Sequence, residues 1–114
     1  MTILDNRGWS IAILLLAAIL EAGGDAVVRK ALHSEAQMPR LLLFAAGGLI
    51  LSAYGYAVNA PAWDFGSLLG LYVVFFFLVS QTMSWLIFGQ PPSMAVMAGG
   101  SLITVGGCVI AFGT

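Results

Sequence analysis

Four long apolar stretches constrain the fold of this chain more than any other feature. They lie at about residues 9–28, 40–58, 65–88 and 94–112, and short polar segments separate them. A helix needs about 20 mostly apolar residues to cross the hydrocarbon core of a bilayer. The pattern therefore predicts an all-α integral membrane protein, in which residues 1–114 form a single bundle of four transmembrane helices.

The composition excludes an ordinary water-soluble domain. Charged residues make up 8% of the chain and apolar residues 61%, whereas a soluble domain carries about 25% charged residues. The net charge of −1 provides no basic patch, so we expect no nucleic-acid partner. The single cysteine, Cys108, and the single histidine, His33, form no metal-binding motif. We expect neither a metal nor another cofactor, and we do not expect an enzyme.

The first stretch places a carboxylate deep in the membrane. A helix that enters the bilayer near Ser10 reaches Glu21 after roughly 16 Å, about half the hydrocarbon thickness. An acid at this depth costs at least ~2.5–3.5 kcal/mol, so Glu21 should face the protein interior or a wet cavity. It could serve helix–helix hydrogen bonding, but an ion or substrate site is the default interpretation of an intramembrane acid.

Two further charges follow Glu21 on the same helix face. Asp25 comes one turn later and Arg29 one turn after that. Asp25 is either a second ligand for a cation or one half of an ion pair with Arg29. The ion pair is the more ordinary interpretation, and the sequence leaves both open.

Small residues on the fourth stretch indicate a helix–helix contact. Gly99, Gly106 and Gly113 recur at seven-residue spacing, with Gly100 and Gly107 beside them. Such a seam suits a tight crossing with another helix in lipid. Because four short spans enclose little volume, we expect a dimer that brings two Glu21 carboxylates to one central cavity.

Several short motifs, in order and spacing, resemble the small multidrug resistance transporters. Glu21 is followed three residues later by Gly24, and Arg29 follows where that family has a basic residue. Ser52-Ala53-Tyr54 resembles a motif of the second helix, and Trp85-Leu86-Ile87-Phe88-Gly89-Gln90 resembles the end of the third. The fourth stretch is similar to the family's dimerisation motif, with Gly99, Leu102, Ile103 and Gly106.

The resemblance implies a proton-coupled exporter that works as an antiparallel dimer in the bacterial inner membrane, as a multi-pass protein. Protons and a small cationic or amphipathic substrate would compete for the paired Glu21 side chains. Tyr54 and Tyr72 would offer ring faces to a cation, and Ser52 would donate a hydrogen bond to Glu21. Asp25 is a further candidate for binding the substrate or the proton.

The third stretch departs from the family pattern. Leu69, Tyr72, Val74 and Phe76 stand where family members usually carry a tyrosine, a tryptophan and two glycines that kink the helix. The guanidinium-exporting members have a tryptophan at the position of Gly24. These differences leave two alternatives open: a flippase for a lipid-linked substrate, and a non-transporting small membrane subunit in which Glu21 pairs with a partner.

The basic residues near the spans bear on orientation. The first connector has Arg29, Lys30 and Arg40, whereas the opposite side has only Arg7. A balance of three against one places the first connector in the cytoplasm, but only weakly. We therefore expect some chains to insert the other way, as an antiparallel homodimer requires; a fixed orientation would favour a heterodimer.

Overall fold

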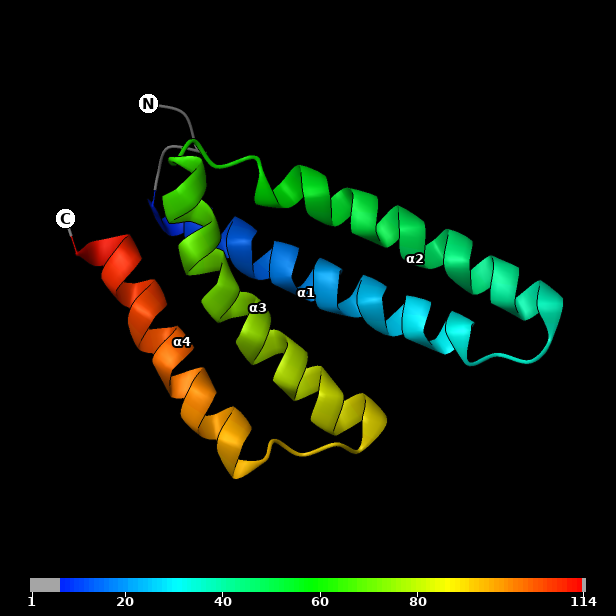
Figure 1. The fold of residues 1–114 in the computed structure, drawn as a ribbon. Helices are drawn as coiled ribbons and strands as arrows, with labels where there is room; N and C mark the ends of the chain where they lie inside the picture. Colours follow the sequence, from blue (N-terminus) through cyan, green and yellow to red (C-terminus); the bar gives the residue numbers. More distant parts are fainter. Residues whose placement is uncertain (1–6, 114) are drawn as a thin grey trace.

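The computed structural model describes residues 7–113, with the side chain of Arg7 excepted, and contains four helices in this range (Figure 1). They are α1 (Arg7–Leu32), α2 (Gln37–Val58), α3 (Phe65–Phe88) and α4 (Met94–Phe112). Each is long and apolar enough to cross a membrane. The predicted all-α, four-span fold class is confirmed.

The helix bounds match the predicted spans closely, except at the first connector. α1 continues to Leu32, and α2 already begins at Gln37, so the segment between them is shorter than the predicted loop. Pro39 falls in the first turn of α2. Proline is tolerated there because the first helical N–H groups have no partner within the helix.

The turn between α3 and α4 is built from local signals. Gly89 ends α3 with a φ of 64°, in the left-handed region that glycine adopts without a steric penalty. The N–H of Gln90 donates to the carbonyl of Ser84 at 3.0 Å, which closes the last turn. The Ser93 hydroxyl then accepts from the Val96 N–H at 3.1 Å and caps the start of α4.

The helices form two antiparallel hairpins, α1–α2 and α3–α4, which contact each other through α1 and α3. Figure 1 shows that the hairpins meet near the two termini and the second connector. From there they diverge, so that the first and third connectors lie apart. The result is a flat, splayed molecule measuring 51 × 37 × 19 Å.

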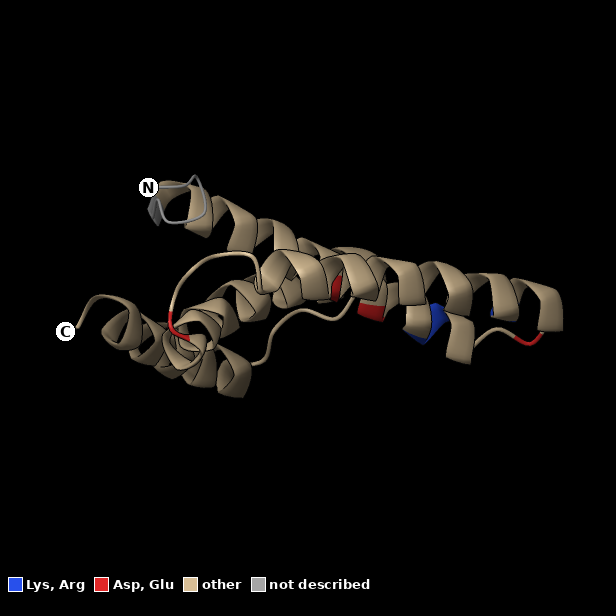
Figure 2. Cartoon of the chain, turned by 90° about the horizontal axis from the view of Figure 1, so that it is seen from above, with Lys and Arg blue, Asp and Glu red and all other residues tan. Residues whose placement is uncertain are grey.

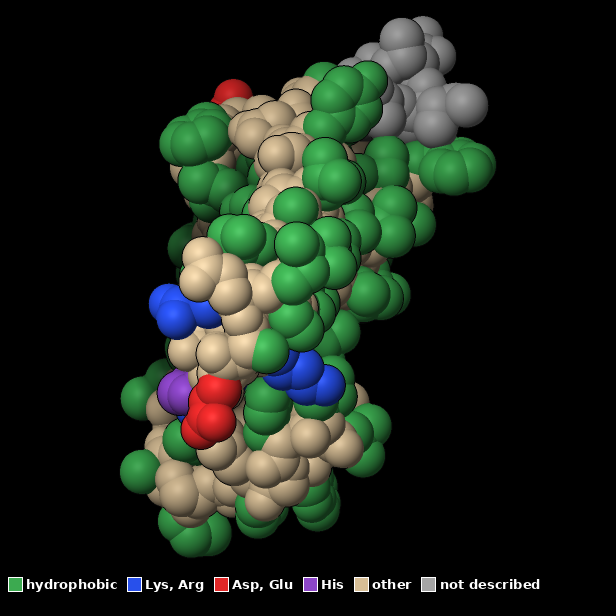
Figure 3. Space-filling view, turned by 90° about the vertical axis from the view of Figure 1, so that its right-hand side faces the viewer, with side chains coloured by type: hydrophobic (Ala, Val, Ile, Leu, Met, Phe, Trp, Pro, Cys, Tyr) green, Lys and Arg blue, Asp and Glu red, His purple; other side chains and the backbone are tan. Residues whose placement is uncertain are grey.

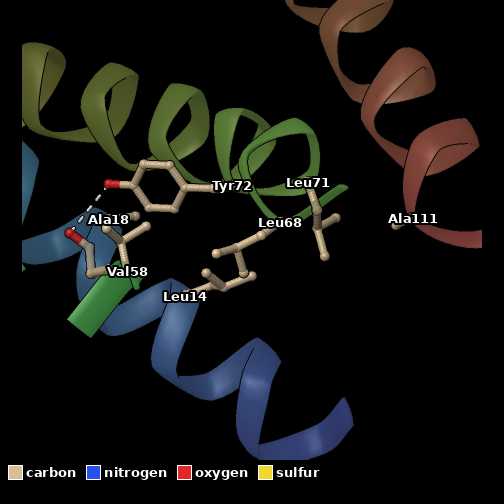
Figure 4. Close-up of a cluster of buried hydrophobic side chains, with 8 residues drawn as sticks. Leu14, Ala18, Val58, Leu68, Leu71, Tyr72 and Ala111 are labelled. Carbon is tan, nitrogen blue, oxygen red and sulfur yellow. Dashed lines mark hydrogen bonds between the residues drawn. The ribbon is translucent and has the colours of Figure 1, made fainter. Parts of the chain in front are cut away.

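The buried core lies where the hairpins meet, and we call this region the closed end. Leu14 of α1 is fully buried, and it packs in one cluster with Leu68 and Leu71 of α3 (Figure 4). The remaining members of the cluster are Ala17, Ala18, Val58, Tyr72 and Ala111. The closed end therefore joins all four helices.

Glycines let the helices of each hairpin approach closely. A Cβ on Gly47 of α2 would lie 2.7 Å from the Val28 side chain of α1. A Cβ on Gly107 of α4 would collide with Val74 of α3, and one on Gly100 would collide with the Phe77 ring. Thus Gly100 and Gly107 form the contact with α3 inside this chain. Each directly follows one of the glycines predicted for the dimer contact, Gly99 and Gly106.

The predicted dimer motif lies on another face of α4. Within the described chain, no atom lies within 4 Å of a Cβ built on Gly99 or Gly106. Leu102 is 76% exposed, and Ile103 is partly buried. This face has room for another helix, and its use as a dimer interface stays a prediction.

Candidate functional site

The deep carboxylate is held by a tyrosine from another helix. Tyr72 of α3 is 4% exposed, and its hydroxyl donates to Oε1 of Glu21 at 2.7 Å. The same hydroxyl lies 3.3 Å from the carbonyl oxygen of Ala17, a contact drawn in Figure 4. A hydrogen bond from a hydroxyl to a carboxylate is about twice as strong as one between neutral groups. Glu21 is thereby tied to α3 about midway along α1.

Aromatic rings extend this site from two helices. The ring of Tyr54 in α2 lies 5.8 Å from the ring of Tyr72, measured between centroids. On the other side, Phe76 stacks on Tyr72 at 6.2 Å. The structure therefore brings Glu21, Tyr72 and Tyr54 into one cluster built by α1, α2 and α3. Tyr72 is almost fully buried, so in this structure Tyr54 is the more accessible ring, and cation binding by either ring stays a prediction.

Ser52 does not take the place that the sequence suggested. Its hydroxyl donates to the carbonyl of Gly48 in its own helix at 3.0 Å, and its side chain is exposed. A serine inside a helix often forms this bond to the carbonyl four residues earlier. The predicted hydrogen bond to Glu21 is wrong in this structure, and Tyr72 supplies it instead.

Beyond Tyr72, α1 and α3 separate and leave a cleft of about 260 Å³. We call this space the α1–α3 cleft. Asp25 and Arg29 line it from α1, Ser80 and Ser84 line it from α3, and Gln90 lines it from the turn after α3. Its apolar lining consists of Ala22, Ala26, Phe76, Met83 and Phe88. Figure 2 shows the acidic residues of α1 in red, midway along the helix.

The polar wall on α3 was missed by the sequence reasoning. Ser80 and Ser84 lie within the third apolar stretch, and we assigned no role to either from the sequence. Their spacing of four residues puts both on one face of the helix, and this was the available signal. Ser80 donates to the carbonyl of Phe77 at 2.9 Å, and Ser84 lies 3.3 Å from both side-chain and backbone oxygens of Gln90.

Asp25 and Arg29 line the same cleft but do not pair. Both side chains are exposed, and among the described residues Asp25 has no ion-pair or hydrogen-bond partner. The Arg29 guanidinium instead lies 5.5 Å from the centroid of the Phe88 ring. The ion pair that the sequence favoured is therefore not formed in this structure.

Comparison with known proteins found sequence similarity to one membrane protein. The chain is similar to a UPF0060 membrane protein of Herpetosiphon aurantiacus. The two are 26% identical over 106 residues, which cover 90% of this chain and 93% of that protein. No protein-family model and no solved structure matches the chain. Together with the four apolar helices, the similarity supports a multi-pass membrane protein.

The site combines a carboxylate with aromatic rings. A carboxylate can bind a proton or a cation, aromatic rings favour a positive charge, and the cleft begins at Ala22, the residue after Glu21. Among residues 7–113, no group of three His, Cys, Asp or Glu side chains lies close enough to hold a metal.

Proposed function

We propose that this protein is a proton-coupled exporter of small cationic or amphipathic compounds, acting through Glu21. One observation carries the proposal: the Tyr72 hydroxyl, on a different helix, binds the Glu21 carboxylate at 2.7 Å beside an open cleft. An intramembrane acid that served only to join helices would be expected within closed packing. Glu21 is only partly buried, its partner Tyr72 belongs to the closed end, and the next residue, Ala22, lines the α1–α3 cleft.

The proposed coupling follows from the chemistry of one carboxylate. Ionised Glu21 accepts the hydrogen bond of Tyr72 through Oε1, and its second oxygen can pair with a cation. A proton on the carboxylate removes the charge that attracts the cation. Proton and cation therefore cannot occupy the site together, and this competition couples their movements in opposite directions.

The same hydrogen bond can transmit the state of Glu21 to the fold. It joins α1 to α3, and protonation of the carboxylate weakens it because the charge assistance disappears. Among the described residues, the buried cluster that joins the two hairpins lies at the closed end. A weaker bond at its border would let them rock about the closed end, as alternating access around a midplane site requires.

We further propose that two copies form the transporting unit in the bacterial inner membrane. In one chain the α1–α3 cleft stays open, and the exposed α4 face at Gly99 and Gly106 has room for a second helix. A second copy inserted in the opposite direction would bring two Glu21 side chains to one cavity.

The test compares Tyr72→Phe with the matched control Tyr56→Phe, which removes the same hydroxyl from an 83% exposed tyrosine of α2. A hydrogen bond to a charged group contributes about 1.5–3 kcal/mol, so Tyr72→Phe should lower proton-driven export by about 10- to 100-fold. The assay is uptake of a cationic dye, such as ethidium, into proteoliposomes with a pH gradient. Tyr56→Phe should match the parent.

Glu21→Gln completes the test, since it removes the charge and keeps the shape. It should abolish both export and the release of protons when dye is added to the purified protein. Parental export by Glu21→Gln would overturn the proposal. An absence of proton release from the parent itself would favour the non-transporting subunit.

A further inference from the structure

The α1–α3 cleft carries opposite charges at two levels. Asp25 and Arg29 are one helical turn apart, about 6 Å along the axis, and both line the cleft. They do not pair with each other. The cleft therefore presents a carboxylate near Glu21 and a guanidinium nearer the first connector. Figure 3, which looks onto that connector, shows charged side chains grouped there among hydrophobic ones.

The opposite wall adds polar groups at the guanidinium level. The Ser84 hydroxyl donates to the side-chain oxygen of Gln90 at 3.3 Å, and both residues line the cleft. This bond orients the Gln90 amide, whose N–H groups can donate to an anionic group beside Arg29. Phe76 and Met83 supply apolar surface in the same cleft.

From this juxtaposition we propose that the cleft is a binding site for small amphipathic zwitterions, with an ammonium group at Asp25 and an anionic group at Arg29. The apolar body of the molecule rests on Phe76 and Met83. This proposal rests on the proposed export function and narrows its substrate class. Asp25 lies one turn from Glu21, so the ammonium group can pass from one carboxylate to the other.

Two features of the cleft suit a small zwitterion. Arg29 repels a cation that carries no compensating negative group, whereas an anionic group on the same molecule turns this repulsion into attraction. The cleft within one chain has a volume of about 260 Å³, which accommodates a molecule of amino-acid size.

The experiment uses phenylalanine and phenethylamine, which differ by one carboxylate. Binding of each is measured by calorimetry on the full-length protein in lipid nanodiscs. Arg29→Gln should weaken phenylalanine binding at least tenfold and leave phenethylamine binding equal or tighter. Asp25→Asn should weaken binding of both. Arg29→Lys, which keeps the positive charge, should retain most of the phenylalanine affinity.

Lys30→Gln is the matched control, because it removes the same charge from the next residue, which does not line the cleft. It should leave both affinities unchanged. Equal effects of Lys30→Gln and Arg29→Gln would mean that the charge acts at long range, and the proposed site would be wrong.

The proposal and the export function can fail separately. If phenethylamine binds in a manner that Glu21→Gln abolishes, and phenylalanine does not bind, the zwitterion site is overturned while the export function stands. If neither compound binds, the zwitterion site is overturned, and dye export by the parent and by Glu21→Gln alone decides the export function.

Discussion

The same two helices, α1 and α3, behave differently at the two ends of their contact. At the closed end, Leu14 of α1 and Leu68 of α3 interlock and are almost fully buried. At the other end, Ala22 and Ala26 of α1 face Ser80 and Ser84 of α3 across the α1–α3 cleft. The first contact is wholly apolar and buried, whereas the second includes exposed charged side chains and leaves a cleft.

The comparison bears on the position of Glu21, the acid of the proposed function. Glu21 stands at the border between the two contacts: it is partly buried, Tyr72 of the closed end holds it, and the next residue, Ala22, lines the cleft. One turn towards the closed end, Ala17 and Ala18 are fully buried. One turn the other way, Asp25 is exposed. Only the border gives a carboxylate both a fixed partner and an open side.

The largest expected effect on stability comes from filling the seam that attaches α4 next to the closed end. A Cβ on Gly107 would collide with Val74 and lie 3.1 Å from the carbonyl oxygen of Gly70. Because backbone cannot move aside easily, Gly107→Val should reduce stability by about 3 kcal/mol, the upper end of the usual range for overpacking. Unfolding by SDS in mixed micelles measures this change.

Gly106→Val separates the two faces of α4. No described atom lies within 4 Å of a Cβ at Gly106, so the monomer should keep its stability. The predicted dimer should weaken, because the added side chain holds two helices apart. Mass measurement in mild detergent reports the change, and an undisturbed dimer would place the interface elsewhere.

A cavity at the closed end should have a smaller effect. Leu14 is fully buried, whereas its neighbour Leu15 is 44% exposed. In lipid, Leu14→Ala loses packing but no transfer from water. A cavity term of about 24 cal/mol per Å³ then gives about 1–2 kcal/mol. Leu15→Ala, the matched control, should be nearly neutral in the same SDS titration. Equal losses would mean that the closed end is no more tightly packed than the lipid-facing surface.

At the cleft, the Asp25 and Arg29 side chains should be energetically independent in folding. They form no ion pair, so Asp25→Asn and Arg29→Gln should have additive effects on stability. A double-mutant cycle should give a coupling energy below about 0.5 kcal/mol. A larger stabilising coupling energy would indicate that Asp25 and Arg29 form the ion pair that the sequence favoured. It would argue against a site in which both charges must be free to bind a ligand.

The smallest expected effect is the preference of the chain for one orientation in the membrane. The cleft end of the molecule carries Arg29, Lys30 and Arg40 in or beside the first connector, whereas the opposite side has Arg7. Because the difference is small, C-terminal reporter fusions should give signal on both sides of the membrane. One or two added lysines in either set of loops should shift the ratio. A single fixed orientation would favour a heterodimer over an antiparallel homodimer.

The sequence by itself determined the four spans and the depth of Glu21. Both depend on local quantities: the length of an apolar run and the rise per residue of a helix. The close α1–α2 contact at Gly47 can also be predicted from the sequence, because a small residue in a span lets another helix approach closely. Among the helix bounds, those at the first connector needed correction. Pro39 lies in the first turn of α2, whereas the sequence pattern predicts it as part of a loop.

Only the tertiary structure decided which side chains meet. Tyr72 and Glu21 are far apart in the chain, and their contact depends on how α3 crosses α1. Ser52 was assigned to Glu21 because its residue type suits the task, but the rotation of α2 turns it outward. The glycines of α4 show the same limit. Their spacing predicts which of them share a face of the helix, but the packing of α4 determines that Gly107 contacts α3 and Gly106 does not. Helix rotation and crossing follow from the sum of many contacts between segments, which no single stretch of sequence encodes.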